Sequence, residues 1–416
     1  MGNWGRHLLT ILLFALGGVF SGLPQVQSAE RNACPVEEGP PGYGKILPGE
    51  AGISGLIRTL SHPSPVENEF CTSPLKAVCG DSSSGISQKS QERRKQTQRR
   101  QAQMLYRAQQ ILAERYGISV SEAQRRYPWP DSNSFTPAAQ ELREAYFQVQ
   151  EVAVQNSEGV LRGWKEQIRA SLIAAMKEDL TGVVPPEQLR ALEAQVSRVR
   201  FLLPSKVFRT GMTSSLELLK GYQSVCGADG LAENAYYQGG GNVSEIVVCP
   251  GLLLSNPISS REHVLHTLAH ELGHVLDVQE SPALKTVYSR FEECVLWSSS
   301  DALKPGRDPK VYPGSGNPRV NVHYHASELL ADYWAMRVIE RQVAGSESRM
   351  EPEKALSLVS KAYGYLCDQR DEGAHPDDQY RIDLLLGSSP VLRGVFGCSR
   401  ALPAGKQECR IPKLAP

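Results

Sequence analysis

Apolar side chains recur every three or four residues through most of the chain, which is the spacing of helices with one buried face. Thr136 and Pro137 mark a good helix start, because threonine caps the first turn and proline fits it. Gly117 is a good helix end. The sequence predicts helices over these ranges: 87–116, 136–180, 185–199, 214–225, 260–278, 281–297, 325–344, 352–367 and 376–387.

A strand is expected over 245–249, where the residues are Glu-Ile-Val-Val-Cys. The predicted fold class is therefore α+β, predominantly helical, with a small antiparallel sheet. No stretch of the chain repeats with the period of a solenoid.

Composition divides the chain into five segments. Residues 1–29 are a predicted signal peptide, and 30–85 are rich in Pro, Gly and Ser and are expected to be irregular structure pinned by disulfides. An added helical domain or arm is predicted over 86–205. Scaffolding is its simplest role, and a prosegment or lid over an active site is the alternative. Residues 206–390 hold most of the histidines, and 391–416 form a tail with two cysteines.

The N-terminus has the pattern of a secretory signal. Arg6 and His7 precede an apolar run over 8–20, and the small residues Ser28 and Ala29 follow it. The run is short for a membrane span, although an uncleaved anchor is the alternative. No later run reaches about 18 apolar residues, so we expect an exported protein, periplasmic or secreted, without an integral membrane segment after signal removal.

All nine cysteines lie beyond the signal, where an exported chain forms disulfides. None shows the Cys-x-x-Cys spacing of a thiolate metal site. We expect a Cys226–Cys249 pair and a Cys398–Cys409 pair that closes the tail. The odd count implies a thiol that is unpaired or that pairs between chains.

Charge excludes one class of partner. The chain has 45 basic and 45 acidic residues, and this balance gives no sign of nucleic-acid binding. One basic cluster lies over 93–100. The cluster is best explained as the solvated face of a helix. Contact with a membrane or an acidic partner is the less favoured interpretation.

The most specific chemical pattern is His-Glu-Leu-Gly-His at 270–274. Histidines four positions apart lie on one face of a helix, so His270 and His274 can hold one Zn²⁺ ion. Glu271 would lie beside the ion and act as a general base. A core helix that happens to carry two histidines is the alternative, but the apolar stripe of this helix passes beside them.

Neighbouring residues support the choice of His270 and His274 as the histidine ligands. Gly273 is costly inside a helix, and its missing side chain would let a third ligand approach closely. A shifted pair, His266 with His270, would put Thr267 where the base belongs, so we reject it.

A catalytic zinc ion needs a third protein ligand. A third histidine shortly after the motif is excluded, because Asp277 and Glu280 occupy the positions that such a motif requires. Glu328 and Asp332 are four apart on a later predicted helix. We predict that Glu328 binds zinc and that Asp332 accepts a hydrogen bond from a ligand imidazole. An ordinary solvated acidic edge is the alternative.

These motifs resemble those of the gluzincin metallopeptidases, of the type that includes HtpX and the CaaX-prenyl endopeptidases. Residues 234–241 and 245–253 resemble the hairpin and edge strand of that family, and 328–332 match its second motif. Residues 375–382 resemble its late His-Pro…Arg-Ile segment. The similarity covers about residues 206–390 and implies a zincin-like catalytic domain there.

The resemblance also suggests roles for two late residues. His375 would donate a hydrogen bond to the transition state, although it could equally cap the helix that begins at Pro376. Arg381 would orient this segment or pair with a carboxylate.

The resulting hypothesis is a zinc-dependent endopeptidase that acts on a protein or peptide. Glu271 would take a proton from a water molecule whose pKa zinc lowers towards about 7. The strand would hold an extended substrate by backbone pairing through Ile246, Val247 and Val248, which predicts loose specificity. An exported binding or chaperone-like protein with a structural or vestigial zinc site is the main alternative, and a latent protease with a spare cysteine on zinc is another.

Overall fold

The computed structural model describes the following residues: 65–80, 85–129, 136–204, 206, 222–227, 229–240, 243–254, 260–276, 282–298, 318–345, 350–368, 378–398 and 409–411. The predicted signal over 1–29, Cys34 and His375 lie outside them. All described residues belong to one compact unit.

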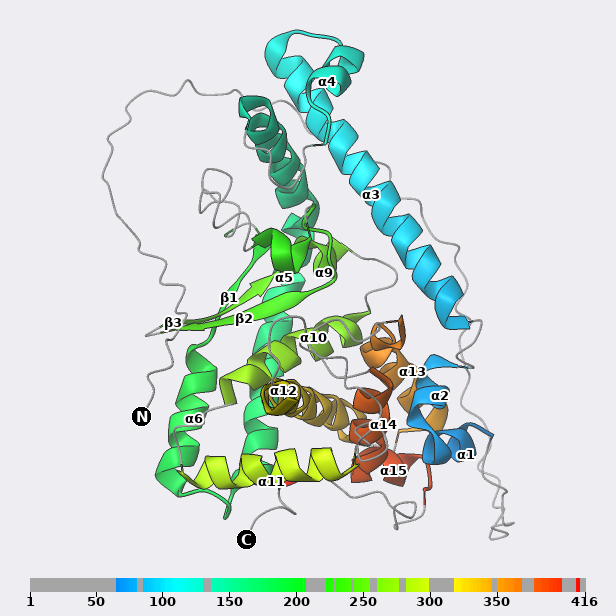
Figure 1. Cartoon of the computed structure of the whole chain (residues 1–416), viewed down its shortest axis with the longest axis vertical. Coiled ribbons are helices and arrows are strands. Elements are labelled where there is room, and N and C mark those ends of the chain that lie inside the picture. The colour runs from blue at the N-terminus through cyan, green and yellow to red at the C-terminus, as the bar shows by residue number, and fades with distance from the viewer. Residues whose placement is uncertain are drawn as a thin grey trace, which may run out of the picture. The chain divides into compact units, whose positions relative to one another are not determined.

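Helices dominate the described chain, as predicted, and a small sheet accompanies them (Figure 1). The elements are α1 (Pro65–Thr72), α2 (Pro74–Cys79), α3 (Gly85–Tyr116), α4 (Val120–Arg126), α5 (Pro137–Leu180), α6 (Pro186–Arg198), β1 (Arg200–Leu202), β2 (Ala235–Gly240), β3 (Val243–Val248), α9 (Pro250–Leu254), α10 (Arg261–Gly273), η2 (His274–Leu276), α11 (Pro282–Ser298), α12 (Pro318–Ala344), α13 (Pro352–Tyr363), η3 (Leu366–Asp368), α14 (Asp378–Ser388) and α15 (Pro390–Val395).

Local sequence explains several helix ends. The Thr136 hydroxyl accepts a 3.2 Å hydrogen bond from the Ala139 N–H, so the predicted start of α5 is confirmed. α12 begins at Pro318, earlier than the predicted 325, because proline fits a first helical turn as well as it fits a loop. Residues 65–79 were expected to be irregular but form α1 and α2.

The sheet is mixed, which corrects the antiparallel prediction. Its strand order is β1-β3-β2. β2 pairs antiparallel with β3, and β1 pairs parallel with β3, so that Phe201 lies opposite Ile246. β1 has three residues, and so short a strand leaves no recognisable alternation in the sequence.

Two hydrophobic clusters share α5. Its half from Leu161 to Leu180 packs in a cluster with α10, α12, α13 and α14, and its half from Leu142 to Val149 packs with α3 and α4. A buried ionic group adds to the first contact, because Arg337 of α12 donates a 2.8 Å hydrogen bond from Nε to Asp179 of α5. α5 therefore supports the helices that carry the histidine motif.

Four disulfides join eight of the nine cysteines: Cys71–Cys398, Cys79–Cys367, Cys226–Cys249 and Cys294–Cys409. The Cys226–Cys249 prediction is confirmed. The Cys398–Cys409 prediction is wrong, because each of these cysteines bonds to a distant partner that packing brings close. α1 and α2 are thereby attached to the C-terminal helices.

Removing the Cys71–Cys398 disulfide should destabilise the fold strongly. The double variant Cys71→Ser/Cys398→Ser is expected to lose about 2–5 kcal/mol of unfolding free energy in denaturant titration. The Cys226→Ser/Cys249→Ser variant is the control, because its bond closes a span of 23 residues rather than 327 and should contribute less. Peptide mapping without reductant checks the pairing, and a peptide joining Cys398 to Cys409 would contradict it.

Among the described residues, no helix is long and apolar enough to cross a membrane.

Candidate metal centre

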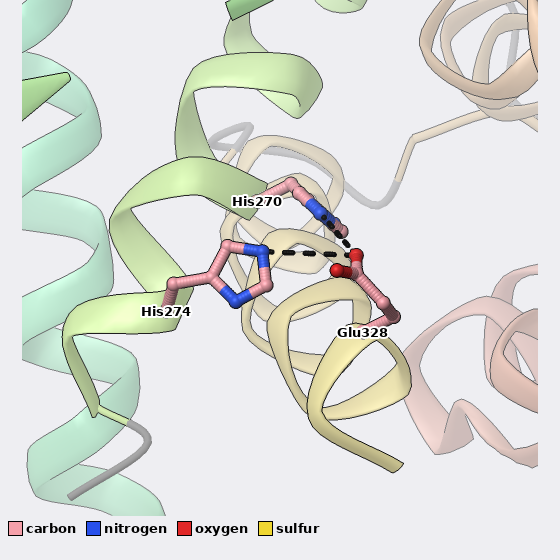
Figure 2. A group of neighbouring side chains, drawn as sticks. All are labelled: His270, His274 and Glu328. Carbon is pink, nitrogen blue, oxygen red and sulfur yellow. Dashed lines mark hydrogen bonds and ion pairs between the residues drawn. The ribbon is translucent and has the colours of Figure 1, made fainter. Parts of the chain in front are cut away.

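Three side chains from two helices meet at one point. His270 and His274 come from the end of α10 and the start of η2, and Glu328 comes from α12 (Figure 2). The Nε2 atoms of His270 and His274 lie 3.1 Å and 3.7 Å from Glu328 Oε2. One ligand atom from each residue lies within 4.8 Å of the others, so the group could hold a metal ion.

The spacing suits a tetrahedral ion. Ligand atoms bound to zinc at about 2.1 Å lie about 3.4 Å from one another in a tetrahedron. The observed separations of 3.1 Å and 3.7 Å bracket that value. Two imidazole nitrogens and one carboxylate oxygen are a donor set that zinc accepts, and three ligands leave one position open. The residues present therefore fit such an ion.

Gly273 allows the two helices to approach. α10 lies between the sheet and α12 (Figure 1). A Cβ atom on Gly273 would lie 3.0 Å from both the Cα and the carbonyl oxygen of Ala331, three residues after Glu328. The close contact predicted at this glycine is thus with the backbone of the helix that carries Glu328.

The Gly273→Ala variant should therefore weaken both the fold and the metal site. Its methyl group meets backbone atoms that cannot rotate away, so we expect a loss of about 1–3 kcal/mol and weaker zinc binding in a metal titration. Gly163→Ala is the matched control, since a Cβ there has nothing within 4 Å in α5. It should gain up to about 1 kcal/mol from helix propensity. Equal stability of the two variants would contradict the argument.

A second layer of buried polar groups holds His270. Its Nδ1 atom lies 2.7 Å from Asp332 Oδ1, which turns Nε2 towards Glu328 Oε2 at 3.1 Å. Arg381 of α14 donates to both Asp332 oxygens, from Nε at 2.6 Å and from a terminal nitrogen at 2.8 Å. Of the two roles considered for Arg381, the structure shows pairing with a carboxylate.

This layer sets the charge of the site. Burial opposes ionisation of Asp332, but Arg381 and His270 hold its pKa well below the usual value. Burial alone would lower the pKa of His270, yet the charge of Asp332 and hydrogen bonds to Asp332 and Glu328 raise it to about 10 in the metal-free protein. A metal ion must therefore displace a proton from His270 when it binds.

Glu271 lies beside the ligands and is held by the sheet. Its side chain is buried, with 8% of the residue exposed, and its Oε2 atom accepts a 2.8 Å hydrogen bond from the Tyr237 N–H of β2. Burial raises the pKa of Glu271 to about 7. Its other oxygen, Oε1, is not used by this bond. The role of the Tyr237 N–H could not be predicted from sequence, because every residue except proline has a backbone N–H group.

The predicted substrate strand needs correction. Ile246, Val247 and Val248 lie in β3, which is the central strand, so β1 and β2 occupy its backbone edges. A peptide cannot add to a strand that is paired on both sides. Among the described strands, β2 has an unpaired edge on the side opposite β3, and its Tyr237 N–H reaches Glu271 from that edge.

The other histidines of α10 lie against the end of α13. His266 is fully buried, and its Nδ1 atom shares a 3.1 Å hydrogen bond with the Tyr365 hydroxyl. The His263 and Tyr365 rings stack with centroids 4.4 Å apart. Burial lowers the pKa of His266 to about 3, so the ring is neutral. His266 is not among the three residues, His270, His274 and Glu328, whose ligand atoms gather at one point.

Searches of protein-family models and of curated proteins found no match to this chain. The geometry of the site therefore carries the functional argument.

Proposed function

We propose that this chain is a zinc-dependent endopeptidase that hydrolyses peptide bonds of proteins in the cell envelope or outside the cell. The main support is the position of Glu271. Its carboxylate is buried beside the two imidazoles and Glu328, and the Tyr237 N–H fixes it by a hydrogen bond. A purely structural metal site needs no such group.

His270, His274 and Glu328 would hold the zinc ion. A zinc ion there supplies Lewis acidity, which polarises a carbonyl and makes water more acidic. Glu271 takes a proton from the attacking water at Oε1 and later gives it to the leaving amine, because Oε2 stays bonded to Tyr237. Burial favours the protonated form of Glu271, and the charge of a zinc ion would favour the carboxylate that accepts the proton.

The unpaired edge of β2 replaces β3 as the proposed substrate strand. Residues of an antiparallel strand point their N–H and C=O groups alternately towards and away from the partner. Because the Tyr237 N–H points away from β3, the backbone groups of Ala235 and Gly239 point the same way. The Ala235 and Tyr237 N–H groups already donate to Asn234 Oδ1 and Glu271 Oε2, so a peptide would pair through the Gly239 N–H and the carbonyl oxygens of this edge. A peptide that pairs with this edge would pass beside Glu271.

The alternative, a binding or chaperone-like protein with structural zinc, has less support. Structural zinc sites have four protein ligands, whereas three side chains gather here within the described part of the chain. The four disulfides support an exported location, periplasmic or secreted, since such bonds persist in oxidising compartments.

A casein assay tests the proposal. The purified mature protein should contain about one zinc ion per chain and should cleave casein. A chelator should stop cleavage, and added zinc should restore it. Casein fragments read by mass spectrometry would give the cleaved bonds. Cleavage that a chelator leaves unchanged, or zinc-loaded protein that cleaves nothing, would refute the proposed function.

A further inference from the structure

One buried hydroxyl lies on the same helix as His270. Thr267 is buried, with 4% of its surface exposed, and within the described part of the chain its Oγ1 atom makes no hydrogen bond. Leaving a buried hydroxyl unpaired costs folding free energy, and valine would fill the same volume without that cost. Such a group indicates a missing hydrogen-bond partner.

The position of Thr267 indicates where that partner comes from. Thr267 lies three residues before His270 and four before Glu271 on α10, and residues with these spacings are neighbours on a helix surface. Positions 263, 267, 270 and 274 follow one helix face. Thr267 therefore lies on the face of the helix that also carries the two ligand imidazoles.

The surroundings of this position are polar but balanced in charge. One turn before Thr267, His263 Nδ1 lies 3.8 Å from Glu233 Oε2, and Tyr365 stacks on the His263 ring. Glu233 also interacts favourably with the guanidinium of Arg100 on α3. Among the described residues the charged groups near this position already face opposite charges, so a neutral group that both donates and accepts is the best match for the threonine hydroxyl.

We propose that Thr267, with His263 one turn earlier, forms a polar subsite that binds a hydroxyl or carboxamide side chain of a substrate residue flanking the scissile bond. This inference rests on the proposed peptidase function. Such a subsite would make the enzyme selective for Ser, Thr, Asn or Gln on the His263 side of the metal. This selectivity departs from the loose specificity expected from backbone pairing alone.

Paired substitutions in enzyme and substrate test the subsite. The zinc-loaded full-length protein is given peptides that differ only in the residue next to the cleaved bond. The value of kcat/KM is compared between Thr and Val, and between Asn and Leu. The wild type should favour Thr over Val and Asn over Leu by about tenfold in kcat/KM. Thr267→Val should bring both ratios to within about twofold, and Thr267→Ser should keep them, because only serine retains the hydroxyl.

Zinc content and the thermal midpoint separate selectivity from misfolding. Thr267→Val should keep its zinc and unfold at the wild-type temperature or above, because it removes an unpaired buried hydroxyl. Unchanged ratios in Thr267→Val, an equal loss in Thr267→Ser, or a wild-type preference for Val and Leu would overturn the subsite.

A binding measurement keeps the two proposals apart. The same peptides, carrying a fluorophore, are titrated into the Glu271→Gln protein with and without Thr267→Val. If the wild type cleaves no peptide but these dissociation constants show the same selectivity, the peptidase function fails and the subsite stands. If cleavage occurs and neither rates nor binding depend on Thr267, the subsite alone fails. If the protein neither cleaves nor binds the peptides, both fail.

Discussion

Glu271→Gln is expected to lower the rate of peptide hydrolysis by at least about 10²-fold while the zinc content stays unchanged. Glutamine has nearly the same shape and can still accept the Tyr237 N–H through its amide oxygen. It cannot take a proton from water. The rate of casein or peptide cleavage and the zinc content of the same sample measure the two effects separately.

A matched control guards against a general disturbance of the site. Glu166→Gln makes the same change on α5, where Glu166 forms an exposed ion pair with Arg169, and should leave the rate unchanged. Hydrolysis by Glu271→Gln at the wild-type rate would remove Glu271 from the mechanism. Loss of zinc together with activity would mean that Glu271 supports the metal rather than the proton transfer.

Asp332→Ala is expected to show the second large effect. It leaves the buried Arg381 guanidinium without its carboxylate, which should cost about 3–5 kcal/mol in unfolding free energy. His270 also loses the acceptor that orients its ring, so zinc affinity should fall about 10–100-fold. Denaturant titration and competition with a zinc indicator measure the two quantities. Glu193→Ala, which breaks an exposed ion pair with Lys177, should change both little.

The double variant Asp332→Ala/Arg381→Met separates these causes. Removing both charges should recover much of the lost stability, because no buried charge remains unpaired. Zinc affinity should stay low, since His270 still lacks its partner. Recovery of zinc affinity together with stability would contradict the orienting role of Asp332.

The part of the site that could be predicted followed from the spacing of residues within single helices. Positions four apart on a helix define a face, so His270 with His274, and Glu328 with Asp332, could be paired before any coordinates. The meeting of the two helices could only be suspected from Gly273, whose contact with Ala331 now gives the reason.

Contacts between distant segments explain what could not be predicted. Cys398 bonds to Cys71, 327 residues away, and no local pattern distinguishes that partner from the nearby Cys409. The three-residue strand β1 pairs with β3 and turns an apparent edge strand into a central one. For Arg381, the sequence left two roles open, and only packing of α14 against α12 selects the pairing with Asp332.

An anomalous diffraction map at the zinc edge tests the central claim most directly. Crystals of the mature protein grown with zinc should show one peak at about 2.0–2.2 Å from Nε2 of His270, Nε2 of His274 and a carboxylate oxygen of Glu328. The fourth position should hold a water molecule near Glu271. A peak coordinated by other side chains, a fourth protein ligand in place of water, or no peak between α10 and α12 would contradict the account.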